Sequence, residues 1–458
     1  MVFSTPIFVF GFLPLFLVSY YALPKGARNW LILIASTGFY AWWRADAVLI
    51  LFAIAGGSYA AGHVATCARS ERKKRWAVRL GVSFNLAVLG WFKYTTFVLG
   101  NLNTAMGGDA LIVPEILLPI GLSFLTFQSI SYVIDVARGD APPTPKLSDF
   151  LAFSSLFPQL IAGPVLRYKD LAHQFETRTH SVAVFAKGLR RFIAGLAMKL
   201  LIADSVAPLA DRIFALPDPT MAEAWTGAIA YSIQLLFDFA GYSAMAIGLG
   251  LMIGFRFPEN FNAPYTSRSI TEFWRRWHIS LSTWLRDYLY VPLGGNRGRR
   301  IKTYRNLLLT MVLGGLWHGA NWTFLIWGIW HGGLMAIERA LGAKSRDRVW
   351  PRAIAWPLTM VLVILGWVVF RAETLGGALT MYAGMAGANG LSMRPELIML
   401  TQSTEVLFLL IGCAISIAPS LSLRTARLAP TAQTAMLSVF CLIVMQARTE
   451  SPFLYFQF

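Results

Sequence analysis

Long apolar segments recur along the chain, separated by short polar stretches. A helix that crosses a bilayer needs about 20 predominantly apolar residues, and many segments reach or approach that length. Some segments are short or carry charges, which is compatible with tilted or re-entrant helices. We predict an all-α polytopic membrane protein with about ten or more membrane helices. The expected helices cover roughly residues 6–23, 30–43, 47–66, 77–99, 116–136, 149–165, 190–213, 225–253, 306–317, 321–340, 352–371, 403–420 and 431–447.

The amino-acid composition supports the prediction of a membrane protein. Hydrophobic residues make up 56% of the 458 residues and charged residues 14%, against about 25% charged in soluble domains. The net charge of +17 is attributed to basic cytoplasmic loops and lipid headgroup contacts, and not to nucleic-acid binding. The cysteines, Cys67, Cys413 and Cys441, are too scattered for a disulfide framework or a metal-binding CxxC pair.

Loop charge and loop length indicate topology and domain organisation. The densest short basic run, "RSERKKR" at 69–75, is assigned to the cytoplasm by the positive-inside rule. If three spans precede it, the N-terminus lies outside. The first apolar segment has no basic flank and no small-residue cleavage site, so we expect it to be retained as a span. Neither an internal repeat nor a linker divides residues 1–458, which predicts a single membrane-embedded domain.

The segment from 255 to 305 differs in character, with 10 Lys and Arg residues against 3 acidic ones. Between Ser269 and Tyr290, apolar residues recur at helical spacing with charged residues between them. This pattern predicts a re-entrant or interfacial helix. The alternative is a helix on the cytoplasmic membrane surface that only anchors the fold.

Histidines are the first candidates for chemistry. His318 and His331 lie in "GGLWHGANWTFLIWGIWHGG" at 314–333, where an ionisable residue is a functional candidate by default. The alternative for His318 is a packing contact between helices, worth about 0.6 kcal/mol. Gly314, Gly315 and Gly319 permit close approach of backbone or ligand.

The second triplet does not duplicate the first. On one straight helix His318 and His331 would stand about 20 Å apart on largely opposed faces, so they could not act on one reacting atom. We therefore interpret His331 as a structural histidine. The remaining histidines, His63, His173 and His180, sit in polar surroundings and carry little weight.

Two polar intrusions interrupt apolar runs. Asp238 in "LLFDFAGYSAMAIG" must be protonated, paired with a cation, or exposed to an aqueous cavity. The expected span at 116–136 carries Ser123, Thr126, Gln128, Ser129 and Ser131. These side chains fit hydrogen bonds between helices or the lining of a tunnel equally well.

Taken together, these motifs resemble the membrane-bound O-acyltransferase (MBOAT) family, and within it the bacterial alginate O-acetyltransferase branch. The resemblance covers nearly the whole chain and rests on six segments in the same order. They are "VFSTPIFVFGFLPLFLVSYYALP", "LPIGLSFLTFQSISYVIDV", "FPQLIAGPVLRY", "FDFAGYSAMAIGLGLMIGFRFPENFNAPY", "SITEFWRRWHISLSTWLRDYLYVPLGGN" and "GGLWHGANWTFLIWGIWHG".

The resemblance implies many helices around a central tunnel, with a basic catalytic region at about 255–340. It implies catalytic roles for His318, at a constriction in the bilayer, and for His278, and it requires none of His331. His318 would act as general base towards a hydroxyl, while His278 or nearby donors would hold the thioester or its oxyanion. We expect no metal and no tightly bound cofactor, with acetyl-CoA as the acetyl donor.

Substrate contacts follow from the same resemblance. Arg275, Arg276 and the "RGRR" run at 297–300 would attract the anionic donor on the cytoplasmic side. Trp317, Asn321 and Asp238 are further expected substrate-binding residues. The implied setting is the bacterial inner membrane. The implied partners are a periplasmic or membrane-anchored serine-hydrolase-like acetyltransferase, a polysaccharide synthesis and export complex, and lipids.

The sequence is compatible with other functions as well. Within the enzyme class the acceptor could be alginate, another exopolysaccharide or peptidoglycan, or the reaction could be teichoic-acid D-alanylation. A membrane transporter is the alternative from another class, and it would be expected to show an inverted internal repeat. A structural scaffold for a polysaccharide synthase complex is the third, and it would tolerate histidine substitutions.

Overall fold

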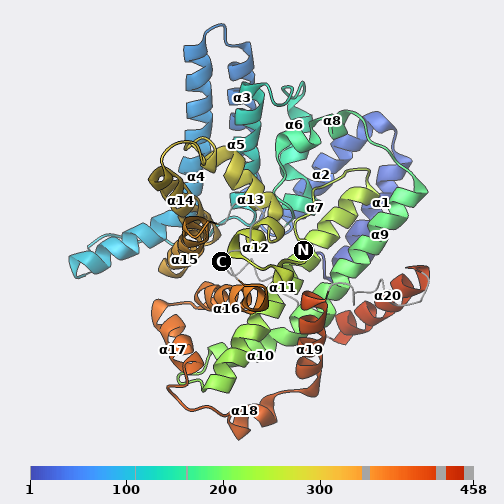
Figure 1. Ribbon diagram of the computed structural model, residues 1–458. Helices are drawn as coiled ribbons and strands as arrows, with labels where there is room; N and C mark the ends of the chain where they lie inside the picture. Colours follow the sequence, from blue (N-terminus) through green and yellow to red (C-terminus); the bar gives the residue numbers. More distant parts are fainter. Residues whose placement is uncertain (1, 109, 161–162, 343–350, 419–429, 448–458) are drawn as a thin grey trace. The chain divides into compact units, whose positions relative to one another are not determined.

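The computed structural model describes residues 2–108, 110–160, 163–342, 351–418 and 430–447. The described residues are helical and contain no β-strand. The chain divides into two compact units, and its helices are drawn in Figure 1. Unit 1 comprises residues 1–192 and 243–258, and unit 2 comprises residues 193–242 and 259–458.

Five helices are long and apolar enough to cross a membrane, among the residues searched. They are Ala47–Cys67, Glu71–Met106, Val182–Phe214, Met221–Met252 and Ala353–Arg371. Shorter apolar helices cover Ile7–Ala22, Ser403–Ile417 and Thr431–Ala447. The chain is therefore a membrane protein with several apolar helices, as predicted.

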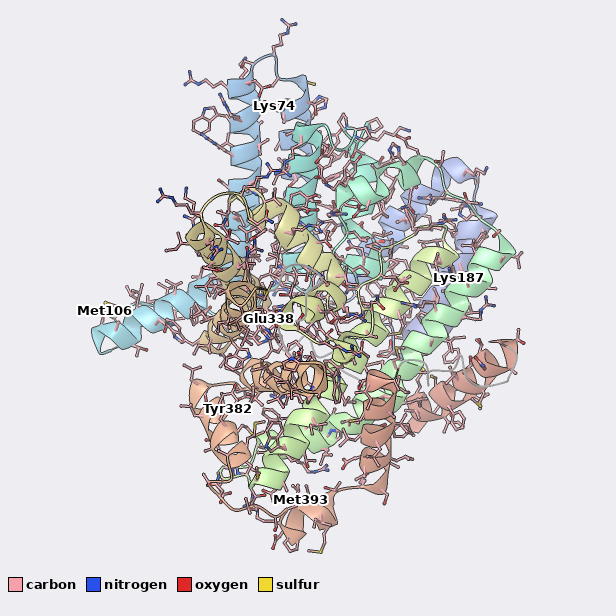
Figure 2. The ribbon with its side chains drawn as sticks, in the orientation of Figure 1. Lys74, Met106, Lys187, Glu338, Tyr382 and Met393 are labelled. Carbon is pink, nitrogen blue, oxygen red and sulfur yellow. The ribbon has the colours of Figure 1, made fainter. Side chains whose placement is uncertain are left out.

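Unit 1 is built from the N-terminal helices. Its elements are η1 (Ile7–Phe12), α1 (Leu13–Ala22), η2 (Lys25–Ala27), α2 (Arg28–Ala41), α3 (Ala47–Cys67), α4 (Glu71–Met106), α5 (Leu122–Arg138), α6 (Leu147–Ser155), α7 (Phe157–Leu160), α8 (Tyr168–Glu176) and the start of α9 (Val182–Ala197). Helix α4 begins at a Ser70 cap and ends at Gly107, whose left-handed φ of 75° stops it. Lys74 and Met106 mark the two ends of α4 (Figure 2).

Polar side chains of α5 bond to neighbouring segments of unit 1. The Gln128 side chain donates to the Phe153 carbonyl at 3.1 Å and accepts from Gln159 at 2.9 Å. Ser131 accepts from the Tyr168 N–H at 3.2 Å. These contacts support the interpretation of this polar helix as one that hydrogen-bonds to other helices.

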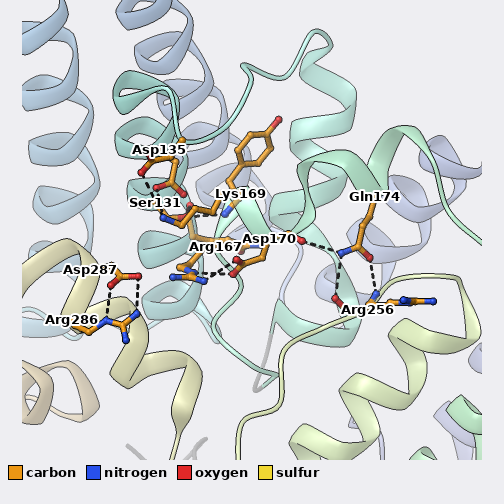
Figure 3. Close-up of polar contacts among 12 residues, drawn as sticks. Ser131, Asp135, Arg167, Lys169, Asp170, Gln174, Arg256, Arg286 and Asp287 are labelled. Carbon is orange, nitrogen blue, oxygen red and sulfur yellow. Dashed lines mark hydrogen bonds and ion pairs between the residues drawn. The ribbon is translucent and has the colours of Figure 1, made fainter. Parts of the chain in front are cut away.

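Largely buried ion pairs lie beside these contacts (Figure 3). Lys169 lies 3.5 Å from the buried carboxylate of Asp135 and 3.7 Å from Asp140. Arg167 forms a bidentate pair with Asp170, with both N···O distances 2.9 Å. This network compensates the Asp135 charge, because a buried carboxylate needs a nearby cation.

Two expected helices of unit 1 begin or end differently from the prediction. The helix expected at 116–136 starts at Leu122, because Pro119 cannot donate a helical hydrogen bond and Gly121 has a left-handed φ of 75°. The helix expected at 149–165 is divided into α6 and α7 around Leu156, whose backbone is not helical. Residues 161–162 of that segment, like 419–420 of the expected helix at 403–420, lie outside the described residues.

Unit 2 contains the remaining elements. They are η3 (Met198–Ala203), α10 (Asp204–Phe214), most of α11 (Met221–Met252), η4 (Pro264–Thr266), α12 (Ile270–Arg276), α13 (Ile279–Leu285), η5 (Arg286–Tyr290), α14 (Arg300–His318), α15 (Trp322–Ala340), α16 (Arg352–Arg371), α17 (Leu375–Met385), α18 (Pro395–Leu400), α19 (Ser403–Ile417) and α20 (Pro430–Ala447). Its centre is aromatic, with Trp277, Trp327 and Trp367 fully buried.

The single helix expected between Ser269 and Tyr290 is wrong in one respect. The structure breaks it into α12, α13 and η5. The first break falls at Trp277 and His278, where Trp277 is extended and His278 has a φ of 43°. A left-handed residue cannot continue a right-handed helix, so the apolar periodicity was real but the helix is interrupted.

Candidate functional site

Helices α14 and α15 form a tight hairpin that carries His318 (Figure 1). Glycines allow the close contact: a Cβ on Gly315 would lie 2.2 Å from the Phe324 carbonyl oxygen, and one on Gly328 would lie 2.5 Å from that of Met311. Small residues at such crossings are the usual way that membrane helices pack closely. The expected close approach at Gly315 is confirmed, and the approaching group is protein backbone.

The chain turns sharply between the two Trp-His-Gly triplets. His318 is the last residue of α14, and Gly319 is extended. Asn321 then caps α15, accepting from the Thr323 N–H at 3.1 Å while its amide donates to the Glu373 carbonyl at 3.0 Å. His318 and His331 therefore lie on different helices, and Asn321, expected to bind substrate, is occupied as a helix cap.

A cavity of about 490 Å³ lies within unit 2, and His318 is part of its wall. Helix α14 contributes residues at spacings of three and four, which place them on one face of the helix. From Leu307 to His318 this face extends for about 16 Å at 1.5 Å per residue. The α14 residues in the wall are Leu307, Thr310, Met311, Gly314 and His318.

The opposite parts of the wall come from α12, α13, η5 and α15. They include Trp274, Leu281, Ser282 and Trp327 together with two cations, Arg275 and Arg286. Both arginines are exposed, and Arg286 pairs with Asp287 at 2.8 Å (Figure 3). The cavity thus combines an aromatic and aliphatic lining with positive charge.

Helix α12 is held in place by Glu338 of α15, which is labelled in Figure 2. The buried Glu338 carboxylate accepts from the Ile270 N–H at 2.6 Å and from the Thr271 N–H and hydroxyl at 2.9 and 2.8 Å. A carboxylate at a helix N-terminus is favourable because it satisfies donors that have no partner within the helix. Glu338 thereby positions one wall of the cavity.

His278 lies next to His318. The two imidazole centroids are 6.5 Å apart, and the Phe239 ring packs edge-on to His278 at 4.6 Å. His278 is 0% exposed, and burial lowers its pKa to about 3. His278 is therefore neutral at physiological pH, and its Nδ1 lies 3.0 Å from the Asn260 Oδ1.

The backbone of His278 is unusual. Its φ of 43° lies in the left-handed region, which costs a residue with a Cβ roughly 1–2 kcal/mol. Such conformations persist where the surrounding structure enforces them and are concentrated at functional sites. This conformation separates α12 from α13 and sets the direction of the His278 side chain.

Aromatic rings enclose His318. Trp317, Trp327 and Phe370 lie at centroid distances of 5.0, 5.2 and 5.3 Å from its imidazole. The side chain is 6% exposed, so it reaches the cavity through a small part of its surface. Trp317 is within 6.2 Å of His278 as well, which brings this predicted substrate-binding residue beside both histidines.

His331 has a different environment. It is 0% exposed, is not part of the described cavity wall, and packs against Trp327 and Trp274 at centroid distances of 5.0 and 5.2 Å. The Trp274 N–H donates to its Nδ1 at 3.3 Å. His331 is therefore packed among aromatic rings, and its structural role stays a prediction.

The other residues predicted to bind substrate are distributed unevenly. Arg275 lies in the cavity wall, whereas Arg276 pairs with Glu272 at 2.8 Å and donates to Thr266. The "RGRR" arginines at 297–300 are exposed at the start of α14. Among the residues that the structure describes, no group of His, Cys, Asp and Glu could hold a metal ion.

Asp238 is paired with a buried lysine. Lys199 Nζ lies 2.7 Å from Asp238 and 2.6 Å from Asp204, and Lys199 and Asp238 are almost completely buried. The sequence left three states for the Asp238 carboxyl: protonated, paired with a cation, or exposed to an aqueous cavity. In the structure it is paired with a cation. Asp238 thus belongs to an ion cluster of unit 2 outside the described cavity wall.

Sequence reasoning missed Asn260, Lys199 and Glu338. Lys199 had a visible signal, because "AMKLLIAD" places a lysine in an apolar run just as Asp238 is placed. Glu338 is likewise an acid within an expected span. Asn260 had no comparable signal, since asparagine in a polar loop such as "PENFNAPY" is ordinary.

The amino-acid sequence of this region matches a known protein family. Residues 139–372, which include His278, His318 and His331, match the pattern of MBOAT, the membrane-bound O-acyltransferase family. The chain is 57% identical over 390 residues to the probable alginate O-acetylase AlgI of Azotobacter vinelandii, covering 84% of this chain and 78% of that protein.

Two further relatives extend the likeness. The probable alginate O-acetylase AlgI of Pseudomonas putida is 48% identical over the full length of both chains. The peptidoglycan O-acetyltransferase of Helicobacter pylori is 37% identical, covering 86% of this chain and 81% of that protein. The chain belongs to the membrane-bound O-acyltransferase family.

Proposed function

We propose that the protein takes an acetyl group from a cytoplasmic thioester donor and passes it across the membrane for O-acetylation of an extracytoplasmic polysaccharide. The observation that carries this proposal is the position of His318 in the wall of the 490 Å³ cavity, with His278 beside it. An imidazole is the side chain best suited to take a hydroxyl proton near neutral pH.

The reaction needs a base and a polarised thioester. His318 removes the proton of the acceptor hydroxyl as its oxygen attacks the thioester carbonyl carbon. The new C–O bond forms, the C–S bond breaks, and the proton passes from His318 to the departing thiolate. Hydrogen-bond donors around the carbonyl oxygen stabilise the tetrahedral intermediate.

The cations near the cavity indicate an anionic donor. Arg275 and Arg286 belong to the wall, and Arg297, Arg299 and Arg300 are exposed at the start of α14. Guanidinium groups bind phosphates through paired charge-assisted hydrogen bonds, which suits acetyl-CoA. The apolar α14 face from Leu307 to Gly314 would then guide the thioester arm towards His318.

A membrane-embedded site accounts for the separation of donor and acceptor. Acetyl-CoA is cytoplasmic, and we place the protein in the bacterial inner membrane, with the polysaccharide on the far side. The acetyl group crosses while the cofactor stays behind. A periplasmic or membrane-anchored serine-hydrolase-like acetyltransferase would complete delivery, together with the polysaccharide synthesis and export complex.

Alginate or a related exopolysaccharide is the proposed final acceptor. The support is that two relatives, at 57% and 48% identity, are probable alginate O-acetylases. A second candidate, peptidoglycan, is supported by the Helicobacter pylori relative at 37% identity. The higher identities favour the exopolysaccharide.

The test replaces His318 by alanine and by glutamine in cells that make the polysaccharide. O-acetylation is measured by NMR of the purified polymer, with the amount of membrane-inserted protein determined by immunoblot. The proposal expects acetylation to fall to background in both variants at normal protein level. Wild-type acetylation in either variant would refute the catalytic role of His318.

A further inference from the structure

The side-chain oxygen of Asn260 lies within hydrogen-bond distance of three polar groups, two from Ser280 and one from His278. It lies 3.2 Å from the Ser280 backbone nitrogen, 2.8 Å from the Ser280 hydroxyl and 3.0 Å from His278 Nδ1. Asn260, His278 and Ser280 are all buried. In such an enclosed place each hydrogen bond has a defined direction, because water cannot substitute for a missing donor.

The Ser280 backbone determines which Asn260 atom is the oxygen. A backbone N–H can only donate, so the amide atom that it meets must be an acceptor. The alternative amide orientation would place an NH₂ group against this N–H. His278 Nδ1 must therefore donate to the same oxygen, and its proton is on Nδ1.

The backbone around Asn260 holds this arrangement rigid. The Asn260 carbonyl accepts from the Ile279 N–H at 2.9 Å, and the Asn262 N–H donates to the Arg276 carbonyl at 2.9 Å. These two bonds clamp both sides of the left-handed residue His278. The loop at 260–262 thus fixes the His278 backbone while the Asn260 side chain fixes its ring.

We propose that Asn260 is a positioning residue that keeps the proton of neutral His278 on Nδ1 and leaves Nε2 as the ring's only acceptor. The inference rests on the acyl-transfer function proposed above. Within the described residues His278 Nε2 has no hydrogen-bond partner. In this tautomer Nε2 can accept a hydrogen bond but cannot donate one, so groups other than His278 must stabilise the oxyanion.

Of the two expectations stated above, that His278 or nearby donors hold the thioester or its oxyanion, this tautomer favours the nearby donors. No sequence pattern reveals the tautomer. His331 provides the opposite case in the same unit: its Nδ1 accepts from the Trp274 N–H. An indole N–H can only donate, so neutral His331 carries its proton on Nε2.

The experiment is ¹⁵N NMR of the full chain, labelled at histidine and reconstituted in lipid nanodiscs. His278→Gln and His331→Gln identify the two signals by their disappearance. We expect the Nδ1–H tautomer for His278 and the Nε2–H tautomer for His331. An Nε2–H tautomer for His278 in the wild-type protein would overturn the proposal, whatever the activity.

Two variants of Asn260 separate positioning from packing. Asn260→Asp keeps an acceptor for Nδ1 and is expected to keep the tautomer. Asn260→Leu removes the acceptor and is expected to lose the tautomer preference and to lower kcat at least about tenfold with little change in KM. Trp274→Phe is the matched spectroscopic control, since it should alter the His331 signal and leave that of His278 unchanged.

The outcomes distinguish this inference from the proposed function. An unchanged His278 tautomer in Asn260→Leu would refute the role of Asn260. If Asn260→Leu does not fold, the wild-type spectrum still decides the tautomer. A fully active His278→Gln variant, with the Nδ1–H tautomer present in the wild type, would instead remove His278 from the acyl-transfer mechanism while the assignment of its proton stands.

Discussion

Replacing Gly315 by alanine should push apart α14 and α15, the two helices of the hairpin that carries His318. The added Cβ would lie 2.2 Å from the Phe324 carbonyl oxygen and 3.3 Å from the Gly328 Cα. Real Cβ contacts essentially never fall below 3.0 Å. The obstacle is backbone, so no side-chain rotation relieves it and α14 must move away from α15 by at least about 0.8 Å, the difference between 3.0 and 2.2 Å.

This displacement has two measurable consequences. Overpacking of this kind typically costs about 1–3 kcal/mol of stability. His318 lies three residues further along α14 and forms part of the cavity wall, so it moves with the helix. A misplacement of about 1 Å in a reacting group can lower the rate about 100-fold.

The chain supplies a matched control for Gly315→Ala. Gly333 is on α15 of the same hairpin, and a Cβ there would meet no atom within 4 Å. Gly333→Ala should be neutral or stabilising by up to about 1 kcal/mol. Thermal unfolding in nanodiscs and acetyl transfer from acetyl-CoA are measured for both variants. Equal stability and activity in the two would refute the claim that backbone contact at Gly315 sets the position of His318.

Three further predictions concern buried polar groups. Lys199→Met leaves Asp204 and Asp238 without their shared cation. It should lower the free energy of unfolding by about 3–5 kcal/mol, which is measured as a lower unfolding temperature. The double variant Lys199→Met, Asp238→Leu should recover part of that stability, and no recovery would contradict the pairing. His331→Ala leaves a cavity among the packed rings of Trp327 and Trp274. It should lower the free energy of unfolding by about 2–5 kcal/mol, while the protein that folds keeps its acetyl-transfer activity. A stable but inactive variant would show a catalytic role instead. Burial lowers the pKa of His278 from 6.5 to about 3. The stability that the neutral ring contributes is therefore complete above pH 6.5 and is lost as the pH falls towards 3. The unfolding temperature of the wild type should fall relative to that of His278→Gln across this pH range, and a difference between the two that does not change with pH would contradict burial of the neutral ring.

The membrane-embedded helices and the close packing beside His318 could be predicted because their causes are local. Apolar length predicts embedded helices, since every backbone polar group must find its partner inside the segment. The glycines around His318 signalled close packing, and the structure places the Phe324 backbone there. Separate helices for His318 and His331 follow from the Gly319–Asn321 turn, which lies between them in the sequence.

The finer parts of the site depend on contacts between distant residues. His278 interrupts a segment whose apolar spacing is helical, because the distant residues Asn260 and Asn262 bind Ile279 and Arg276 on either side of it. Hydrophobic periodicity does not detect a single left-handed residue. The partner of Asp238 is 39 residues away in sequence, at Lys199, and only packing of η3 against α11 reveals which cation compensates the carboxylate.

In the proposed mechanism an acetyl group, and not the whole donor, crosses the membrane at His318. The most direct measurement uses proteoliposomes of the full chain with acetyl-CoA outside, labelled separately in the acetyl group and in the CoA moiety, and a nucleophilic acceptor inside. This mechanism requires that acetyl label appears on the acceptor, that CoA label stays outside, and that His318→Ala abolishes the transfer while His331→Ala retains it. Entry of both labels, or acetyl transfer by His318→Ala at the wild-type rate, would contradict it.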